Sequence, residues 1–495
     1  MSLVISVKQI VDESANPLLG IDESWERVLL SNVAHVLNGF AFKSKLFNND
    51  QGRPLLRIRD VGAAQTETLY DGPYDDRYLV ERGDLVIGMD GDFKCAPWTG
   101  PKALLNQRVC KITPNTDYYD AAFLAHVLPG YLSAINDHTS SSTVKHLSSR
   151  SVQEIPLPLP PLAEQKRIVV KVEELLARVN AARERLAAVP AILKRFRQSV
   201  LAAACSGRLT EDWRQENPIS GVTVRDASVP GEEDRVALPS IPPTWGWQRT
   251  EALCDPDRPI TYGVIKLGPP VESGVPTLRS SDVRWLHIDS SGIKTIGKEI
   301  ADDYSRTYLK GGEVLVTVRG TLGGVAVVPP EMTGFNISRE VAMLPVDTSH
   351  VADYLALTIA CRTSQNWLSS KAKGVAYTGV NIRDLKRLPL AIPPETESQE
   401  VVRRVDKLFE LADAIETRLT AAVIRAEKLT QSILAKAFRG QLVPTEAELA
   451  RREGRDYEPA SVLLERIKAE REEQAAKKKP AVRKRAGGRK RVAER

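Results

Sequence analysis

Two stretches of the chain carry apolar residues at alternating steps of four and three. The first comprises Ile168, Val172, Leu175, Val179, Ala182, Leu186, Val189, Leu193, Phe196 and Val200. The second comprises Val401, Val405, Leu408, Ala412, Ile415, Leu419, Ala422, Ala426, Leu429 and Ile433. This alternation predicts the a and d seam of a coiled coil. A surface helix packed on its own domain is the alternative, but such helices rarely keep a strict heptad beyond about three turns.

The two stretches belong to a tandem repeat. Equivalent positions are separated by 233 residues, which we call the repeat offset. Pro160-Pro161 falls on Pro393-Pro394, and the same register holds without a gap for some fifty residues. Further upstream, with small gaps, "PLLRIRDV" (54–61) resembles "PTLRSSDV" (276–283). Self-similarity at a fixed offset indicates repeated structural units. Each half is therefore predicted to be a globular domain followed by a long helix.

The globular halves have the pattern of mixed α/β domains. The segments "GDLVIGM" (83–89) and "GEVLVTV" (312–318) predict strands, because short apolar runs with β-branched residues follow a glycine. Residues 121–132 and 352–368 predict helices. The fold class is therefore α+β, with two mixed α/β domains joined by two long helices. Either helix orientation is physically possible, and we predict an antiparallel coiled coil, because it would let two repeats mimic a two-fold dimer.

Prolines mark three places along the helices. At each Pro-Pro pair the fixed φ of proline suits an extended entry followed by the first helical turn, so each pair predicts a rigid exit from its domain. Pro190 interrupts the first heptad stretch, where the repeat has Val423. A proline costs about 3 kcal/mol inside a helix. We therefore expect a kink or a short break at Pro190.

The repeat suggests boundaries for the whole chain. They are an N-terminal extension (1–22), a first domain (23–159), a helical region (160–210), a linker (211–243), a second domain (244–392), a second helical region (393–443), a charged C-terminal helix (444–476) and a basic tail (477–495).

The charge of the chain is unevenly distributed. The tail holds ten Lys or Arg and one Glu, which gives it a charge of +9. Because the whole chain has a net charge of +6, positions 1–476 carry a net charge of −3. We expect the tail to be disordered. Any nucleic-acid surface on the body must be a local patch. No apolar run approaches the roughly 20 residues needed to span a bilayer, and "MSLVIS" is too short for a secretory signal, so a cytoplasmic protein is expected.

Motifs for catalysis are missing from the sequence. The five cysteines and six histidines show no metal-ligand spacing, and buried free thiols are expected. No G-x-x-x-x-G-K-[ST] phosphate loop occurs, which argues against ATP binding. The Asn-Pro-Pro-aromatic motif of adenine methyltransferases is also missing. The sequence therefore favours binding over chemistry.

At "LPPLAEQKRIV", through the heptads and at "QSVLAAACSGRLTEDWR", the chain resembles the specificity subunit of type I restriction–modification systems. The resemblance covers nearly the whole chain, including "EPASVLLERIKAERE" (458–472). It implies two target recognition domains that each read one half of a bipartite site in double-stranded DNA. It also implies that the helix pair sets the gap and docks two modification subunits, which restriction subunits join. No cofactor is expected on this chain, because S-adenosylmethionine, ATP and Mg belong to the partners.

Polar residues near glycine-containing loops are the candidates for DNA contact, because base edges and phosphates are bound by Arg, Lys, Ser, Thr and similar side chains. In the first domain they are Lys43, Ser44, Arg57, Arg59, Ser142, Thr143 and Lys145. In the second they are Lys266, Arg279, Ser280, Arg319, Thr321, Lys373, Tyr377 and Thr378. Asp90 and Asp92 are candidates to accept a cytosine amino group.

Two other functions compete with this interpretation. A single-chain restriction enzyme with its own methyltransferase is disfavoured by the missing motifs. A coiled-coil scaffold that binds protein partners without reading DNA stays open on the residues alone.

Overall fold

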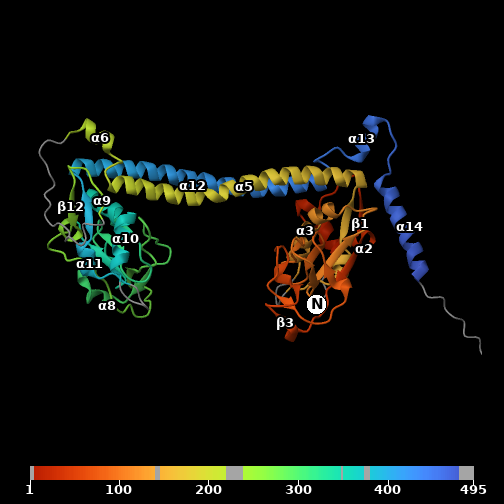
Figure 1. Cartoon of the computed structure of the whole chain (residues 1–495), viewed down its shortest axis with the longest axis horizontal. Helices are drawn as coiled ribbons and strands as arrows, with labels where there is room; N and C mark the ends of the chain where they lie inside the picture. The colour runs from red at the N-terminus through yellow and green to blue at the C-terminus, as the bar shows by residue number, and fades with distance from the viewer. Residues whose placement is uncertain (1–4, 140–144, 219–237, 347–348, 373–378, 479–495) are drawn as a thin grey trace, which may run out of the picture. The chain divides into compact units, whose positions relative to one another are not determined.

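The chain folds into two compact units. The structure, a computed structural model, describes residues 5–139, 145–218, 238–346, 349–372 and 379–478. Unit 1 comprises Met1–Arg185 with Ala422–Arg495, and unit 2 comprises Leu186–Ala421. Each unit contains one globular domain, called domain 1 or domain 2, and parts of two long helices, α5 (Leu162–Cys205) and α12 (Glu395–Phe438). Within each unit these helices lie side by side (Figure 1).

The long helices start and stop in the same way. Both are 44 residues long, and each begins just after its Pro-Pro pair. Beyond their C-terminal ends, Gly207 and Gly440 have φ values of 71° and 69°. This left-handed conformation favours glycine and terminates a helix. The predicted pair of long helices is confirmed.

Of the two outcomes expected at Pro190, the short break is wrong, because α5 is one helix through this residue, and the kink stays a prediction. A proline removes one hydrogen bond, here the one to the carbonyl of Leu186. Pro190 is exposed, so solvent can reach this turn. The helix therefore loses one hydrogen bond without losing its continuity.

Domain 1 is a mixed α/β domain. Its helices include α1 (Val7–Glu13), α2 (Leu30–Val33), α3 (Ala121–Asp137) and α4 (Ser149–Gln153). Its strands are β1 (Glu26–Leu29), β2 (Ala34–Asn38), β3 (Phe47–Asn48), β4 (Arg53–Leu56), β5 (Leu69–Tyr70), β6 (Leu79–Val80), β7 (Leu85–Gly88), β8 (Cys95–Pro97), β9 (Ala103–Leu105), β10 (Val109–Pro114) and β11 (Pro156–Leu159). An antiparallel sheet has the order β2-β10-β7-β8, and a second sheet has the order β3-β5-β4-β9-β6. β1 pairs with β11, which leads into α5.

Domain 2 repeats the four-stranded sheet of domain 1, whereas its second sheet has three strands in place of five. Its strands are β12 (Gly246–Arg249), β13 (Thr261–Tyr262), β14 (Val275–Leu278), β15 (Lys294–Ile296), β16 (Val314–Thr317), β17 (Val325–Val327), β18 (Asn336–Ile337), β19 (Val341–Leu344) and β20 (Pro389–Ile392). The sheet order β13-β19-β16-β17 matches that of domain 1, and β12 pairs with β20 as β1 does with β11. β14 and β18 run parallel, as β4 and β9 do. The repeat is therefore present in the topology, and the predicted strands at 83–89 and 312–318 are β7 and β16.

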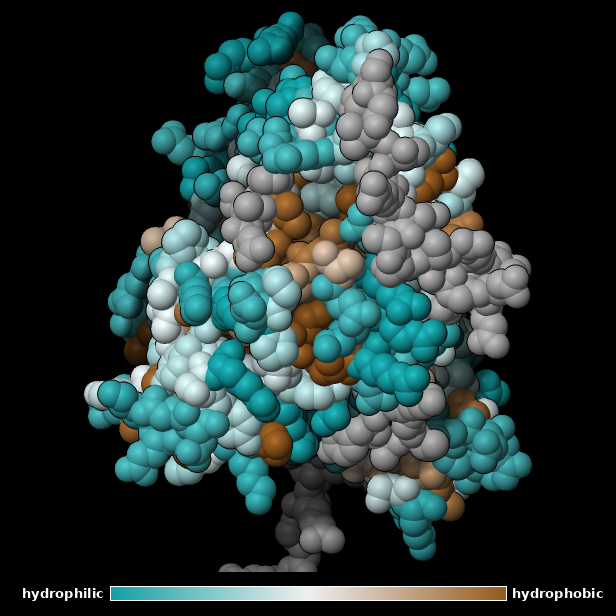
Figure 2. Space-filling model, turned by 90° about the vertical axis from the view of Figure 1, so that its left-hand side faces the viewer, coloured by the Kyte–Doolittle hydropathy of each residue, from teal (hydrophilic) through white to brown (hydrophobic). Residues whose placement is uncertain are grey.

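The helices of domain 2 differ from the prediction at one place. They include α6 (Glu211–Glu216), α8 (Lys298–Asp302), α9 (Ser349–Ala360), α10 (Arg362–Lys371) and α11 (Ile382–Arg387). The segment 352–368 was expected to be helical, and it is divided between α9 and α10 at Cys361, which has an extended backbone. The side of unit 2 seen in Figure 2 is mainly hydrophilic, with hydrophobic side chains near its centre.

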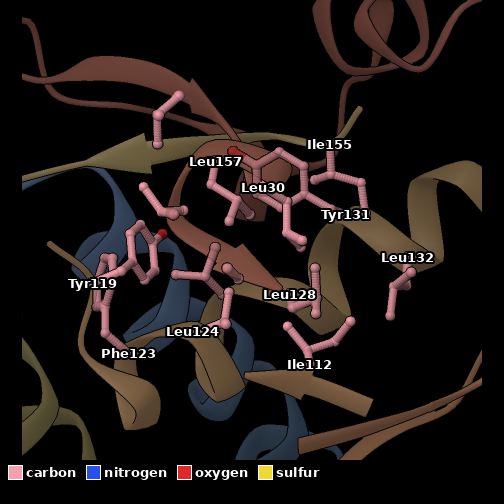
Figure 3. Close-up of a cluster of buried hydrophobic side chains, with 14 of the residues drawn as sticks. Leu30, Ile112, Tyr119, Phe123, Leu124, Leu128, Tyr131, Leu132, Ile155 and Leu157 are labelled. Carbon is pink, nitrogen blue, oxygen red and sulfur yellow. The ribbon is translucent and has the colours of Figure 1, made fainter. Parts of the chain in front are cut away.

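The core of unit 1 draws on both ends of the chain. Tyr119, Phe123 and Leu128 of domain 1 pack with Leu157 of β11 (Figure 3). α1 adds Val7, Ile10 and Val11 to the same core, so the N-terminal extension belongs to this domain. The described part of the C-terminal region, which ends at residue 478, contains two helices, α13 (Glu446–Glu453) and α14 (Ala460–Lys478), in place of the single helix predicted. Leu463 and Ile467 of α14 are buried in the core.

Candidate nucleic-acid interface

A buried glutamate fixes the start of α5 to domain 1. Glu164 is fully buried, and its Oε1 accepts a hydrogen bond from the Trp25 indole at 3.1 Å. Its Oε2 accepts one from the backbone N–H of Glu446, the first residue of α13, at 2.8 Å. Burial raises the pKa of the Glu164 carboxyl from its ordinary value of 4.5 to about 7, because the charged form loses its hydration. We call this set of contacts joint 1.

The same position in the repeat fixes the start of α12 to domain 2. Glu397 is also fully buried, and it accepts a hydrogen bond from the Trp245 indole at 2.9 Å. The Thr210 hydroxyl donates to it at 2.7 Å, and Arg214 of α6 forms an ion pair with it at 2.9 Å. We call this set joint 2. In both joints the segment that follows one long helix supplies donors to the start of the other.

Sequence reasoning missed both joints, although a signal was present. Glu164 and Glu397 are related by the repeat offset, and each domain opens with a tryptophan. A glutamate in the first turn of a charged helix has the pattern of a solvated side chain. Only the fold shows that an indole from the domain reaches it.

Ion pairs show how the long helices are oriented. In unit 2, Arg197 of α5 contacts Asp413 at 2.5 Å and Glu416 at 2.9 Å. In unit 1, the earlier residue Arg183 lies 3.9 Å from the later residue Glu427. The residue number of the contacted acid in α12 rises as the residue number of the arginine in α5 falls. The two helices are therefore antiparallel, as predicted. The Arg197 guanidinium holds the pKa of Glu416 below its usual range.

The predicted seam is buried unevenly. Ile168, Val172 and Val179 are buried, and so are Val401 and Val405. Leu175, Leu186, Leu408 and Leu419 are among the half-buried seam residues, whereas Ile415 is 36% exposed. A two-helix pair covers one side of each helix, and only the helix ends gain a further neighbour from a domain. The middle of the seam therefore keeps accessible apolar surface.

In domain 1 four candidate residues lie on or beside two short 3-10 helices. Lys43 and Ser44 are exposed at the start of the first (Ser44–Leu46). Arg57 precedes the second (Ile58–Asp60), and its guanidinium lies over the Phe47 ring at 5.9 Å. Arg59 is 56% exposed and donates to Thr68 at 3.0 Å. These side chains can reach a ligand.

The other candidates of domain 1, apart from Asp92, are engaged inside the domain or are not described. Lys145 donates to the carbonyl and the side-chain oxygen of Asn136, at 2.7 and 2.9 Å, so it completes the end of α3. Asp90 binds His146 at 2.6 Å and lies 3.4 Å from Arg108. Asp92 is exposed. Ser142 and Thr143 lie outside the described residues.

Two candidates of domain 2 are tied to neighbouring acids. The Arg279 guanidinium bonds Asp282 through two nitrogens, at 3.2 and 3.0 Å. Ser280 is buried and donates to Glu340 at 2.9 Å. Neither group is available to a base without a change of partner. The equivalent arginine of domain 1, Arg57, lacks this carboxylate contact, since only its backbone N–H bonds Asp60.

Three other candidates of domain 2 are accessible. Lys266 and Thr321 are exposed, and so is Arg319, which lies over the Tyr262 ring at 5.2 Å. Arg319 and Thr321 share one turn with Gly320, whose φ of 73° favours glycine. All three residues of this turn are exposed. Lys373, Tyr377 and Thr378 lie outside the described residues.

The described residues contain no cluster of ligands that could hold a metal ion. Their five cysteines are free thiols, of which Cys110 and Cys361 are buried and the other three half-buried. Among the helices described, none combines the length and the hydrophobicity needed to cross a bilayer. The structure is therefore that of two matched domains, each joined to the same helix pair.

Comparisons with known proteins agree with this geometry. The sequence matches the family described as type I restriction modification DNA specificity domain over residues 22–190 and 274–425. It is 42% identical over 484 residues to the type I restriction enzyme EcoBI specificity subunit of Escherichia coli, covering 97% of this chain and 99% of that protein. It is 31% identical over 414 residues to the EcoDI specificity subunit of Escherichia coli, covering 80% and 86%. The fold resembles the HsdS subunit of Thermoanaerobacter tengcongensis, with a TM-score of 0.50, 20% identity and coverage of 85% and 98%.

Proposed function

The chain belongs to the type I restriction–modification DNA specificity family, and on that premise we propose that each of its globular domains reads one half of a bipartite DNA target. The observation that carries this proposal is the repeat itself: two domains with the same four-stranded sheet, each fixed by a buried glutamate to one antiparallel helix pair. Two copies of a reading domain on a common support suit a site made of two separate halves. The matches reported above give no support to a scaffold without DNA readout.

The helix pair acts as the ruler between the half-sites. The seam from Ile168 to Val200 covers 33 positions, or about 50 Å at ~1.5 Å per residue. Half-sites on one face of a duplex lie about 34 Å apart per helical turn. Joints 1 and 2 support this role, because a flexible exit from either domain would let the spacing drift.

The chain is a non-catalytic subunit that docks its enzymatic partners along the helices. In unit 2, Ile192 of α5 and Leu411 and Ile415 of α12 are exposed, and in unit 1 so are Ile424 and Leu429 of α12. Large apolar side chains on a solvent-facing helix suit a partner helix. We assign this surface to two modification subunits, which carry S-adenosylmethionine, with ATP and Mg on the restriction subunits that join them.

Methylome sequencing of a host with and without this gene tests the proposal. We expect methylated adenines in a bipartite motif that disappear when the gene is removed. Inserting four helical residues near Leu186, with a matching insertion at the paired turn of α12, lengthens the ruler by ~6 Å. The gap should then widen by one or two base pairs, at ~3.4 Å per pair. An unchanged gap with unchanged half-sites would show that the helices do not set the spacing.

A further inference from the structure

A basic groove lies in unit 2 between α5 and domain 2. One side is lined by Lys194, Arg195 and Gln198 of α5, and another by Arg362 and Gln365 of α10, with Trp285 and Gly323 completing it. Its volume is about 730 Å³, and none of its lining residues is acidic. The groove therefore concentrates positive charge in a body whose overall charge is close to zero.

The three cations of this groove are available to a ligand. Lys194, Arg195 and Arg362 are exposed, and within the described ranges none of their side chains forms an ion pair or a hydrogen bond. The nearby Arg197 differs, because Asp413 and Glu416 already neutralise it. Unpaired cations held around one hollow attract an anion more strongly than scattered surface lysines do.

The floor of the groove is held in place by packing. The Trp285 indole donates to the Ala360 carbonyl at 3.4 Å, and its ring lies 5.7 Å from that of Phe409 on α12. Gln365 donates to the Ile359 carbonyl at 2.7 Å. α10 begins at this groove, so the positive end of its dipole adds to the charge of the side chains. The site is thus formed before any ligand arrives.

The corresponding helix surface of unit 1 lacks this charge. By the repeat offset, Lys194 corresponds to Glu427 and Arg195 to Lys428. Glu427 is paired with Arg183. One position has therefore reversed its charge between the repeats, and the groove is a property of unit 2.

We propose that this groove binds the phosphodiester backbone of duplex DNA beside the half-site read by domain 2. The inference rests on the proposed function and adds a phosphate clamp to it. Gly323, which lines the groove, lies two residues after Thr321 in the sequence. A DNA strand bound in the groove therefore adjoins the exposed Arg319–Thr321 turn. Phosphates are bound by Lys, Arg, Gln and helix N-termini, whereas protein interfaces are depleted in Lys and centre on apolar anchors. The lining therefore fits DNA better than an acidic protein.

The salt dependence of DNA binding tests the clamp. The probe is a duplex with the target found by methylome sequencing, and the protein is the full chain with its modification subunits. Each phosphate contact contributes about 0.9 to the slope of log affinity against log salt. We expect Arg195→Gln to reduce the slope by about 0.9, and Lys194→Gln with Arg195→Gln by about 1.8, equally on target and non-target duplexes. Lys428→Gln is the matched control, because it removes an exposed charge at the same register in unit 1 and should leave the slope unchanged.

Phosphate neutralisation locates the contact. Methylphosphonates placed one at a time along both strands should weaken wild-type binding at one or two positions flanking the half-site of domain 2. The double variant should lose no further affinity at those positions, as a double-mutant cycle requires of a shared contact.

Three results would overturn the inference. The first is a salt slope that is the same in the double variant as in the wild type. The second is a salt slope that falls as much in Lys428→Gln as in the groove variants. The third is unchanged DNA binding by the groove variants with weakened assembly of the modification subunits, which would identify a protein interface. The preference of the wild-type complex for target over non-target duplexes is measured before any variant is made. If the wild-type complex shows no such preference, the proposed function itself is contradicted.

Discussion

Joints 1 and 2 hold the same place in the repeat but differ in charge. In both, an indole from the domain donates to a fully buried glutamate in the first turn of a long helix. At joint 2, Arg214 pairs with the Glu397 carboxylate. At joint 1, the direct partners of Glu164 are two neutral N–H groups, and its pKa rises to about 7.

The difference shows that geometry and charge were fixed separately in the two repeats. Both joints share the contact of a tryptophan indole with a buried glutamate. What neutralises the glutamate can be an arginine from a following helix or a proton from solvent. Joint 1 is therefore expected to respond to pH, and joint 2 to the loss of one salt-bridge partner.

The largest effect is expected from Glu397→Gln, which leaves the Arg214 guanidinium beside a neutral amide. Breaking a buried ion pair by removing one partner costs roughly 3–5 kcal/mol. We expect a loss of about 4 kcal/mol in the free energy of unfolding of unit 2. Urea unfolding followed by tryptophan fluorescence measures it, since five of the seven tryptophans (213, 245, 247, 285 and 367) lie in this unit.

Glu164→Gln is the matched control for that substitution. At pH 8 it removes a charge that is costly to bury and one hydrogen-bond acceptor, so the expected loss is about 1 kcal/mol. Equal losses in the two variants would mean that the ion pair does not distinguish the joints.

The pH dependence of joint 1 is the next largest effect. A carboxyl with a raised pKa in the folded state binds its proton more tightly there than in the unfolded chain. Its contribution to stability is full below about pH 4.5 and is lost as the pH rises through about 7. The loss is at most about 3 kcal/mol, at about 1.4 kcal/mol per pKa unit.

Hydrogen exchange of peptides around positions 155–172, measured at pH 5, 6, 7 and 8 with correction for the intrinsic rate, follows this change locally. We expect protection to fall with pH in the wild type and the fall to be absent in Glu164→Gln. A pH trend that survives the substitution would assign it to other groups.

Arg57 and Arg279 compare the two recognition domains at equivalent positions. Arg57 lies over Phe47 without a carboxylate partner for its guanidinium among the described residues, so Arg57→Ala should weaken binding to one half-site by about 1–2 kcal/mol. Arg279 is paired with Asp282, so Arg279→Ala should lower stability by about 1 kcal/mol and leave base preference unchanged. Competition binding with duplexes altered in either half-site separates these outcomes. Unchanged half-site affinity in Arg57→Ala would remove this residue from the interface.

The smallest effect is expected along the helix pair. Arg197→Ala should cost about 1 kcal/mol, because Arg197 contacts two carboxylates that are partly exposed. Arg183→Ala should cost a few tenths of a kcal/mol at most, since its contact with Glu427 is 3.9 Å long and exposed. Thermal unfolding of both variants at low and high salt compares them. A larger effect at Arg183 would contradict the ranking.

The sequence was most informative where structure repeats along it. Heptads and Pro-Pro pairs predicted both long helices, and the repeat offset predicted two domains of one kind. The helix through Pro190 was misjudged, because the loss of one hydrogen bond at an exposed turn does not outweigh the packing on either side.

The candidate site was less predictable, because availability depends on neighbours that are distant in sequence. Ser280 has the composition of a groove-reading residue, but Glu340, sixty positions later, binds its hydroxyl. Lys145 resembles a loop cation, but it completes the end of α3. The groove around Arg195 and Arg362 combines segments that lie far apart along the chain, so no local pattern predicts it.

The contact between Glu164 and Glu446 has a consequence for synthesis. Unit 2 is one continuous stretch, and it can fold as soon as Ala421 has left the ribosome. Unit 1 needs Phe438, Leu463 and Ile467 for its core and Glu446 for its joint, so its first segment, Met1–Arg185, emerges long before its partners. During translation the first domain therefore exposes part of its core until α14 has been synthesised. This interval is when chaperone binding or aggregation should concentrate.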